Sequence, residues 1–250
     1  MRIAIISDIH GNAYALDQAL ADIARQAVDQ MVCLGDAIQG GPQPAEVVAR
    51  LRELPCPVVM GNADAWLLTG IETGAEPTSP ERQRKLDAVR AWSLSKLSAD
   101  DRAFIAAFQP TVEIPLNDER KLLCFHGSPT SFDEIILPTM PEAEFQAIFA
   151  SYLPSLVTGG HTHLQQIRPI GTTDAFFFNP GSVGFAYGHG QAEGTFYANA
   201  WAEYAILTVE RVRIALEFRR VAYDAAALID IYRSSGRPFA DEAIAQYRAQ

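Results

Sequence analysis

Five short apolar stretches in this chain each end directly in a small polar cluster. The clusters are Ser7-Asp8-Ile9-His10, Gly35-Asp36, Gly61-Asn62, His126-Gly127 and Gly159-Gly160-His161-Thr162-His163. Short apolar runs of this kind are typical of buried strands. In open α/β sheets the carboxyl ends of the strands line one crevice, so side chains that follow different strands meet there. The sequence therefore predicts a sheet whose strand ends bring these polar residues to a single site.

Segments with helical periodicity separate the first strand-like runs, which cover residues 2–7, 31–34 and 57–60. After Asn12, a suitable helix cap, apolar residues recur at helical spacing as far as Ala27. This alternation of strand and helix implies an α/β fold with a largely parallel sheet and right-handed crossovers. Further strand-like runs follow at 121–125, 155–158, 175–178, 204–209 and 212–218, of which the last two are expected to form a hairpin.

The middle of the chain, about residues 65–110, has a different pattern. Ser79 and Ser98 each precede a typical first helical turn, which predicts a helical pair inserted between two sheet-forming halves. The tail, residues 223–250, is also predicted to be helical, with a break near Gly236. Because the sequence contains no internal repeat and no linker, residues 1–250 are expected to form one domain.

Charge and composition exclude some classes of function. The formal net charge is −10, which disfavours a duplex nucleic-acid binder but not an enzyme for small phosphate esters, because a bound metal inverts the local field. The N-terminal apolar run is too short for a signal peptide, and no stretch approaches the roughly 18 apolar residues of a membrane helix. The three cysteines have neither metal-site nor disulfide spacing. We therefore expect a cytoplasmic protein without a membrane partner.

The placement of the histidines favours a metal site. A single Asp-x-His or Gly-Asp is usually a cap or a turn. Here, however, four of the five histidines follow strand-like runs, namely His10, His126, His161 and His163. Two imidazoles that are two residues apart, as in His161 and His163, can face one metal or two adjacent metals. The fifth, His189, lies in a glycine-rich stretch and is expected to be structural or exposed.

Taken in order, these motifs resemble the calcineurin-like metallophosphoesterase superfamily, whose pattern is D-x-H, G-D, G-N-H-[DE], H and G-H-x-H. The chain is most similar to the small bacterial and archaeal phosphodiesterase-like branch of that superfamily. Four segments carry this similarity: Ser7-Asp8-Ile9-His10-Gly11-Asn12, Leu34-Gly35-Asp36, His126-Gly127-Ser128-Pro129 and Asn179-Pro180-Gly181-Ser182. The resemblance covers most of the chain, with the middle helices and the tail least constrained.

The resemblance implies a fold and a set of ligands. The implied fold is a four-layer α/β/β/α sandwich of two mixed sheets flanked by helices. One divalent metal would be held by Asp8, His10, Asp36 and His163, and a second by Asp36, Asn62, His126 and His161, so that Asp36 bridges both. Manganese is expected first, with iron, zinc, cobalt or nickel also suited to these ligands. Two such ions about 3.5–4 Å apart can share a hydroxide nucleophile that attacks a phosphate ester in line.

One position departs from the family pattern. Where the family carries a histidine after Gly-Asn, this chain has Ala63. That histidine is thought to protonate the leaving group, which alanine cannot do. The resemblance assigns catalytic roles to Asp36 and Asn62, whereas Asp64 is either an ordinary turn or cap residue or a substitute proton relay. The missing imidazole favours substrates whose leaving group departs without a strong acid.

Three further residues are weaker candidates. Asn12 is first a helix cap but could also contact the substrate, and Ser128 follows a metal-ligand candidate and could do the same. Asn179 belongs to a segment that has the composition of a turn.

The expected activity is metal-dependent hydrolysis of phosphodiesters of small molecules. Three alternatives use the same site: a phosphomonoesterase, a dinucleoside polyphosphatase and a protein phosphatase. A non-catalytic metal-binding scaffold is a further alternative, although scaffolds of this kind tend to lose ligands. A zinc β-lactamase-type hydrolase is disfavoured, because Leu164-Gln165-Gln166 follows the His-x-His motif where that class requires Asp and His.

Overall fold

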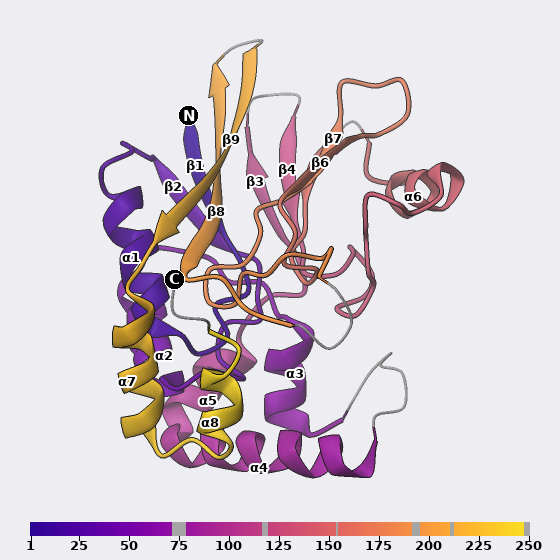
Figure 1. Ribbon diagram of the computed structural model, residues 1–250. Helices are drawn as coiled ribbons and strands as arrows, with labels where there is room; N and C mark the ends of the chain where they lie inside the picture. The colour runs from indigo at the N-terminus through magenta and orange to yellow at the C-terminus, as the bar shows by residue number, and fades with distance from the viewer. Residues whose placement is uncertain (72–78, 117–119, 154, 192–195, 211–212, 248–250) are drawn as a thin grey trace.

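The computed structural model describes residues 1–71, 79–116, 120–153, 155–191, 196–210 and 213–247, and it contains two mixed β-sheets (Figure 1). The first sheet has the order β2-β1-β8-β9, with β2 at Gln30–Cys33, β1 at Arg2–Ile6, β8 at Trp201–Glu210 and β9 at Arg213–Ala222. The second has the order β3-β4-β5-β7-β6, with β3 at Val112–Pro115, β4 at Lys121–Cys124, β5 at Leu156–Thr158, β7 at Phe176–Asn179 and β6 at Gln166–Pro169. Strands β1 and β2 are parallel, as are β4, β5 and β7, whereas β8 runs antiparallel to β1 and β9.

Alternate residues of the central strands pack on opposite sides of each sheet. In β1, Ile3 and Ile5 belong to the core between the sheets, whereas Ala4 and Ile6 face the helical layer. On the far side of the second sheet, Phe125 packs in a third core with helix α6 at Glu142–Phe149. The layers are therefore helix, sheet, sheet and helix, and the predicted four-layer α/β fold is confirmed.

The remaining helices lie on the outer face of the first sheet and across one end of the molecule (Figure 1). They are α1 at Ala13–Ile23, α2 at Pro44–Glu53, α3 at Asn62–Thr69, α4 at Pro80–Lys96, α5 at Ala99–Ala106, α7 at Ala225–Ser235 and α8 at Ala240–Ile244. Helix α1 begins where predicted, because the side chain of Asn12 accepts a hydrogen bond from the Ala15 N–H. No helix in the described ranges is both long and apolar enough to cross a membrane.

Three local expectations need correction. Residues 57–60 were expected to be a strand but form only isolated bridges, at Val58 and Val59; Pro57 has no N–H to donate to a ladder. Strands β3 and β6 were not predicted, because both are short edge strands with mixed composition. In the described part of the middle segment there are three helices instead of two, since α3 precedes the expected pair of α4 and α5.

Candidate metal centre

All seven predicted ligand residues lie in loops at the carboxyl ends of strands or at the start of α3. They form two groups, Asp8, His10 and His163 in one and Asp36, His126 and His161 in the other, each with potential ligand atoms within 4.8 Å of one another. Asn62 adjoins the second group, with its Oδ1 3.0 Å from the Nε2 of His126. The structure thus brings together residues that are far apart in the sequence, as in the His10–His163 contact, which joins residues 153 positions apart.

The loops that carry these side chains are bent in a way that non-glycine residues rarely adopt. Five of the seven non-glycine residues with positive φ in the described chain belong to the two groups: Asp8, His10, Asp36, His161 and His163, with φ between 48° and 67°. A left-handed conformation costs an L-residue roughly 1–2 kcal/mol. Backbone hydrogen bonds between the loops hold this geometry, such as the one from the His10 N–H to the Asp36 carbonyl at 2.8 Å. Strain of this kind is often concentrated at functional sites.

Three of the four imidazoles are oriented through their Nδ1 atoms. The Nδ1 of His10 lies 3.0 Å from the Gln39 carbonyl, that of His126 2.8 Å from the Leu34 carbonyl and that of His163 2.7 Å from the Phe185 carbonyl. A carbonyl can only accept, so each Nδ1 carries the proton that it donates. When such a ring is neutral, the lone pair of its Nε2 points into the site, which is the arrangement that metal-binding histidines require.

Asp8 has one oxygen held and one left free. Its Oδ2 accepts hydrogen bonds from the Ser7 hydroxyl at 2.6 Å and from the His161 N–H at 3.2 Å. Its Oδ1 is buried, has no hydrogen-bond donor among the described residues, and lies 3.2 Å from the Nε2 of His163. Buried polar atoms are normally satisfied, so this oxygen is suited to a cation.

Asp36 lies between the two groups. Its Oδ1 accepts a hydrogen bond from the Ala63 N–H at 2.8 Å. Its Oδ2 is 3.3 Å from the Nε2 of His126 in one group and 3.8 Å from the Nε2 of His10 in the other. A carboxylate oxygen in this position can contact cations in both groups, so the donor set fits two divalent metals.

The metal-free site contains mutually stabilised charges. Burial would raise the pKa of Asp36, but the neighbouring imidazoles, His126 first, lower it. Burial would likewise lower the pKa of His126, but Asp36 raises it to about 10. Asp8 and His163 form a similar pair: despite burial, His163 lowers the pKa of Asp8, and Asp8 raises the pKa of His163.

Asp64 is buried behind the loop that carries Asp36. Its oxygens accept hydrogen bonds from the N–H groups of Ala37 at 3.1 Å and Ile38 at 3.0 Å. Burial, and then the negative charge of Asp36, raise the pKa of Asp64 to about 7. These contacts favour a structural role for Asp64, which anchors the Asp36 loop. They do not favour the alternative role of a proton relay.

Neither candidate substrate contact is among the residues that line the cavity beside the metal-ligand groups. Asn12 is buried, with its amide donating to the Gly184 carbonyl at 3.0 Å in addition to its role as a helix cap. Ser128 is also buried, and its hydroxyl accepts a hydrogen bond from the Ser131 N–H. His189 is exposed, as expected, with its Nε2 2.6 Å from the Thr162 carbonyl.

Two residues that sequence analysis treated as part of a turn support the site directly. The Asn179 amide donates to the Gly160 carbonyl at 2.6 Å and so fixes the loop that carries His161. The Ser182 hydroxyl donates to the Asp8 carbonyl at 2.8 Å. Their position in the sequence could have indicated this role, because Asn179 ends strand β7 and Ser182 follows it, much as the ligand clusters follow their strands.

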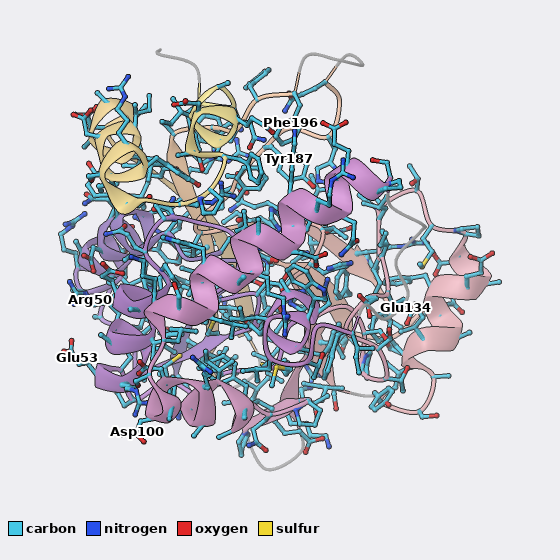
Figure 2. All side chains as sticks on the ribbon, turned by 90° about the horizontal axis from the view of Figure 1, so that it is seen from below. Arg50, Glu53, Asp100, Glu134, Tyr187 and Phe196 are labelled. Atoms are coloured by element: carbon cyan, nitrogen blue, oxygen red, sulfur yellow. The ribbon has the colours of Figure 1, made fainter. Side chains whose placement is uncertain are left out.

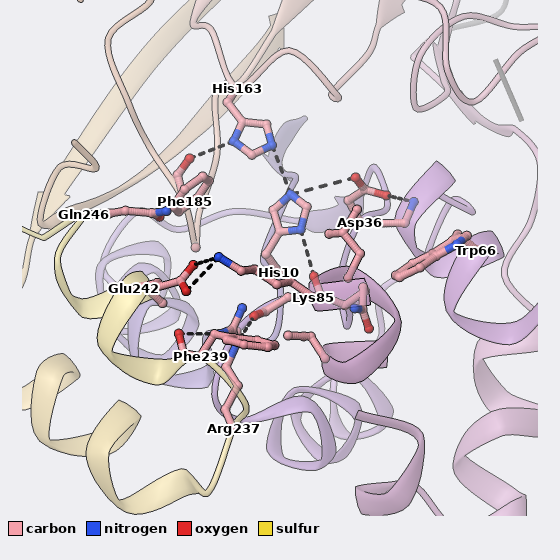
Figure 3. Close-up of a pocket in the computed structure, with 18 of the residues that line it drawn as sticks. His10, Asp36, Trp66, Lys85, His163, Phe185, Arg237, Phe239, Glu242 and Gln246 are labelled. Atoms are coloured by element: carbon pink, nitrogen blue, oxygen red, sulfur yellow. Dashed lines mark hydrogen bonds and ion pairs between the residues drawn. The ribbon is translucent and has the colours of Figure 1, made fainter. Parts of the chain in front are cut away.

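A cavity of about 630 Å³ opens beside the two groups (Figure 3). Trp66, Phe185 and Tyr187 supply apolar surface near the histidines. Figure 2 shows Tyr187 and Phe196 together on the face seen from below, and their ring centroids are 5.2 Å apart. The site therefore combines metal-ligating groups with aromatic walls.

Comparison with known proteins agrees with this site. Over its whole length the chain is similar to the crystal structure of a metallophosphoesterase from Sphaerobacter thermophilus, at 25% identity, a TM-score of 0.71 and 98% coverage of both chains. It shares its fold with the hypothetical protein PH1004 from Pyrococcus horikoshii, at 20% identity, a TM-score of 0.78, and coverage of 98% of this chain and 96% of that one. It is also 27% identical to the uncharacterized protein MJ0912 of Methanocaldococcus jannaschii over 198 residues, which are 73% of this chain and 76% of that protein.

A sequence model of the calcineurin-like phosphoesterase superfamily domain matches residues 1–211, a range that contains every ligand candidate. The chain therefore belongs to the calcineurin-like phosphoesterase superfamily.

Proposed function

We propose that this protein is a phosphodiesterase that uses two divalent metal ions. The observation that carries the proposal is the position of Asp36, whose Oδ2 faces His126 on one side and His10 on the other. A carboxylate shared by two groups of imidazoles is a suitable bridge between two cations.

The proposed ligands follow the two groups. One ion would take Asp8, His10, Asp36 and His163, and the other Asp36, Asn62, His126 and His161. Mixed nitrogen and oxygen donors suit manganese, our first choice, and also iron, zinc, cobalt or nickel. Two bound ions would supply electrophilic activation of the phosphoryl oxygens and of the attacking water.

The side chains of this chain set the charge and orientation of that centre. Two aspartates carry two negative charges, which two divalent cations exceed, so the loaded site attracts phosphate although the protein is acidic. Asn62 contributes a neutral amide oxygen, and Asp36 is held in place by the Ala63 N–H. The role proposed for Asp64 is to fix the Asp36 loop through Ala37 and Ile38.

Two features support diesters over monoesters. The cavity extends well beyond the metal-ligand groups, so it offers room for a second substituent on phosphorus. Its walls near those groups are aromatic, which suits aryl or nucleoside substituents better than a fully charged monoester. Ala63 also lines the cavity and brings no acid to the leaving group, which favours substrates with good leaving groups.

The test compares bis(p-nitrophenyl) phosphate with p-nitrophenyl phosphate, using protein loaded with manganese. We expect kcat/KM for the diester to exceed that for the monoester by at least about tenfold, and both activities to disappear in Asp36→Asn. A preference for the monoester would favour a phosphomonoesterase. If two bound metals gave no turnover of either ester, of dinucleoside polyphosphates or of phosphopeptides, the chain would be a scaffold.

A further inference from the structure

The cavity has a second end that the metal centre does not use. Its walls there come from α4, from α8 and from the segment between α7 and α8, and they include Arg82, Lys85, Arg237, Phe239 and Glu242. In Figure 3, His10 lies between His163 above and the group of Arg237 and Phe239 below. A molecule bound at the metal end can therefore extend toward cationic side chains.

Arg237 is the main cation at this end. Its Nε donates to the Gly40 carbonyl at 2.6 Å, and its Nη1 donates to the carbonyls of Pro238 at 2.9 Å and Phe239 at 3.3 Å. None of the ion pairs among the described residues includes a carboxylate bound to Arg237. Burial lowers the pKa of this guanidinium, since its charge is poorly solvated. A partly buried arginine that faces a cavity without a carboxylate partner is suited to an external anion.

The other two cations differ from each other. Lys85 is largely neutralised, because its ammonium lies 2.9 and 3.0 Å from the carboxylate oxygens of Glu242 and 3.5 Å from Glu81. Arg82 lies one turn before Lys85 on the same face of α4, and its guanidinium forms no ion pair with any described residue. Arg82 and Arg237 therefore remain available to a ligand.

Arg237 is connected to the metal-ligand groups through the loop that contains Gln39 and Gly40. It binds the carbonyl of Gly40, while the carbonyl of the preceding residue, Gln39, accepts the Nδ1 proton of His10. One short peptide segment thus contacts both the guanidinium and a proposed metal ligand. Because Arg237 and the metal-ligand groups line the same cavity, a molecule bound there can present one anionic group to each.

Phe239 lies between the cations with unusual geometry. It is 41% exposed and adopts a left-handed backbone with φ of +57°. The Lys85 ammonium is 5.6 Å from the centroid of its ring. An exposed aromatic ring in a strained backbone at a cavity offers a flat surface for a sugar or a base.

We propose that Arg237, assisted by Arg82, forms a second anion subsite that binds a phosphate group remote from the scissile one. The substrate class is then a phosphodiester that carries an additional phosphate on its retained group, such as a nucleoside derivative with two phosphates. Guanidinium groups bind phosphate through charge-assisted hydrogen bonds, and the Nη2 of Arg237 is the nitrogen that donates to no described residue. This inference rests on the proposed phosphodiesterase function.

The kinetic test uses two probes with the same leaving group. They are the p-nitrophenyl ester of thymidine 5′-phosphate and the same ester with an added 3′-phosphate, assayed with manganese-loaded full-length protein. The 3′-phosphate should raise kcat/KM by about tenfold or more, mainly through a lower KM. Arg237→Gln should reduce this ratio to near one, and Arg82→Gln should reduce it several-fold.

Arg84→Gln is the matched control, because Arg84 is exposed on α4, does not line the cavity and loses the same charge. It should keep the wild-type ratio. A ratio near one in the wild type, or a ratio unchanged in both Arg237→Gln and Arg82→Gln, would overturn the subsite. Because each variant is judged by a ratio, a partial loss of folded protein does not affect the result.

A binding arm separates this proposal from the function on which it rests. Thymidine 3′,5′-bisphosphate and thymidine 5′-phosphate are titrated into the same proteins by calorimetry, which needs no turnover. Tighter binding of the bisphosphate by tenfold or more, lost in Arg237→Gln, supports the subsite even if no ester is hydrolysed. Equal binding of the two ligands contradicts the subsite, whatever the outcome of the activity assay.

Discussion

The Nε2 atoms of His10 and His163 face each other at 3.0 Å, although both rings donate their Nδ1 protons to backbone carbonyls. Two neutral imidazoles held in this way direct lone pairs at each other, which is unfavourable unless a proton or a cation lies between them. The free Oδ1 of Asp8 lies 3.2 Å from the same His163 atom. These contacts lead to a first prediction about metal binding.

We expect the wild-type protein to bind two equivalents of manganese and to become more stable as it does so. At a free metal concentration about 100 times Kd, binding adds about 2.7 kcal/mol, or roughly 5–10 °C in Tm for a chain of this size. Asp36→Asn should weaken the binding of both ions, whereas Asp8→Asn should weaken the binding of one. Metal analysis after gel filtration and thermal unfolding with and without a chelator measure these effects.

Two results would contradict the prediction that the protein binds two metal ions through Asp36. If chelator-treated protein, shown to be free of metal, has the same Tm and the same turnover as the loaded protein, the two groups do not form a metal centre. If Asp36→Asn loses only one ion, Asp36 is not a bridge.

The second prediction concerns Asn62, the one ligand candidate with a neutral oxygen donor. Its amide oxygen is 3.0 Å from the Nε2 of His126, so the ion on this side has one fewer carboxylate than the ion beside Asp8. We expect this ion to leave first on dialysis, and Asn62→Asp to retain it about tenfold more tightly. Anomalous scattering from a crystal dialysed to one equivalent would locate the remaining ion. Density on the Asn62 side alone would contradict this order.

A third prediction tests the packing around Asp8. A Cβ atom on Gly160 would overlap the Ser7 hydroxyl oxygen and come within 2.8 Å of the Asp8 Oδ2. Gly160→Ala should therefore displace Asp8, weaken metal binding by at least about tenfold and destabilise the fold by about 1–3 kcal/mol. Gly188→Ala is the matched control, since a Cβ there meets no atom within 4 Å. If Gly160→Ala and Gly188→Ala bind metal with the same affinity, Asp8 is not held as described.

The fourth prediction concerns stability against acid at Asp22, far from the metal centre. Burial would raise the pKa of Asp22, but hydrogen bonds from Tyr204 at 2.6 Å, Arg219 at 2.9 Å and Arg25 at 2.9 Å lower it. The folded-state pKa is thus below the unfolded value of about 3.9. The stabilisation is therefore present above about pH 4 and is lost as pH falls through the folded-state pKa.

Asp22→Asn tests this sign. We expect the variant to be less stable than the wild type by about 1–3 kcal/mol at pH 7, with the difference shrinking below pH 4. Urea unfolding of metal-free protein at several pH values measures it. A difference that is constant from pH 7 to pH 3 would show that the charge of Asp22 is not responsible.

The metal-ligand candidates other than Asn62 could be selected from the sequence because each belongs to a short motif after a strand. His161 and His163 are two residues apart, and Asp8 and His10 likewise, so local spacing carries the signal. The expected fold class is confirmed for the same reason. By contrast, the run around Val58 has strand composition but pairs only through isolated bridges.

The cationic end of the cavity could not be predicted. Lys85 and Glu242 form an ion pair although 157 positions separate them, and neither belongs to a motif. Arg237 follows the predicted break at Gly236, and its contact with Gly40 depends on how the helical tail packs. Contacts made only by tertiary packing leave no periodic pattern in a single sequence.

The last prediction concerns Ala63, which lines the cavity and binds Asp36 only through its backbone N–H. Since no imidazole is present here, hydrolysis should depend steeply on the acidity of the leaving group, and aryl diesters should react far faster than alkyl or ribose diesters. General acid catalysis contributes about 10²–10⁴-fold, so Ala63→His should accelerate poor substrates much more than good ones. The backbone contact to Asp36 does not depend on the side chain, so Ala63→Ser serves as a polar control without an acid.

A plot of log kcat/KM against leaving-group pKa should be steep in the wild type and in Ala63→Ser, and shallower in Ala63→His. A shallow wild-type slope that steepens in Asp64→Asn would instead make Asp64 the proton donor. If no variant changes the slope, proton delivery is not what Ala63 alters.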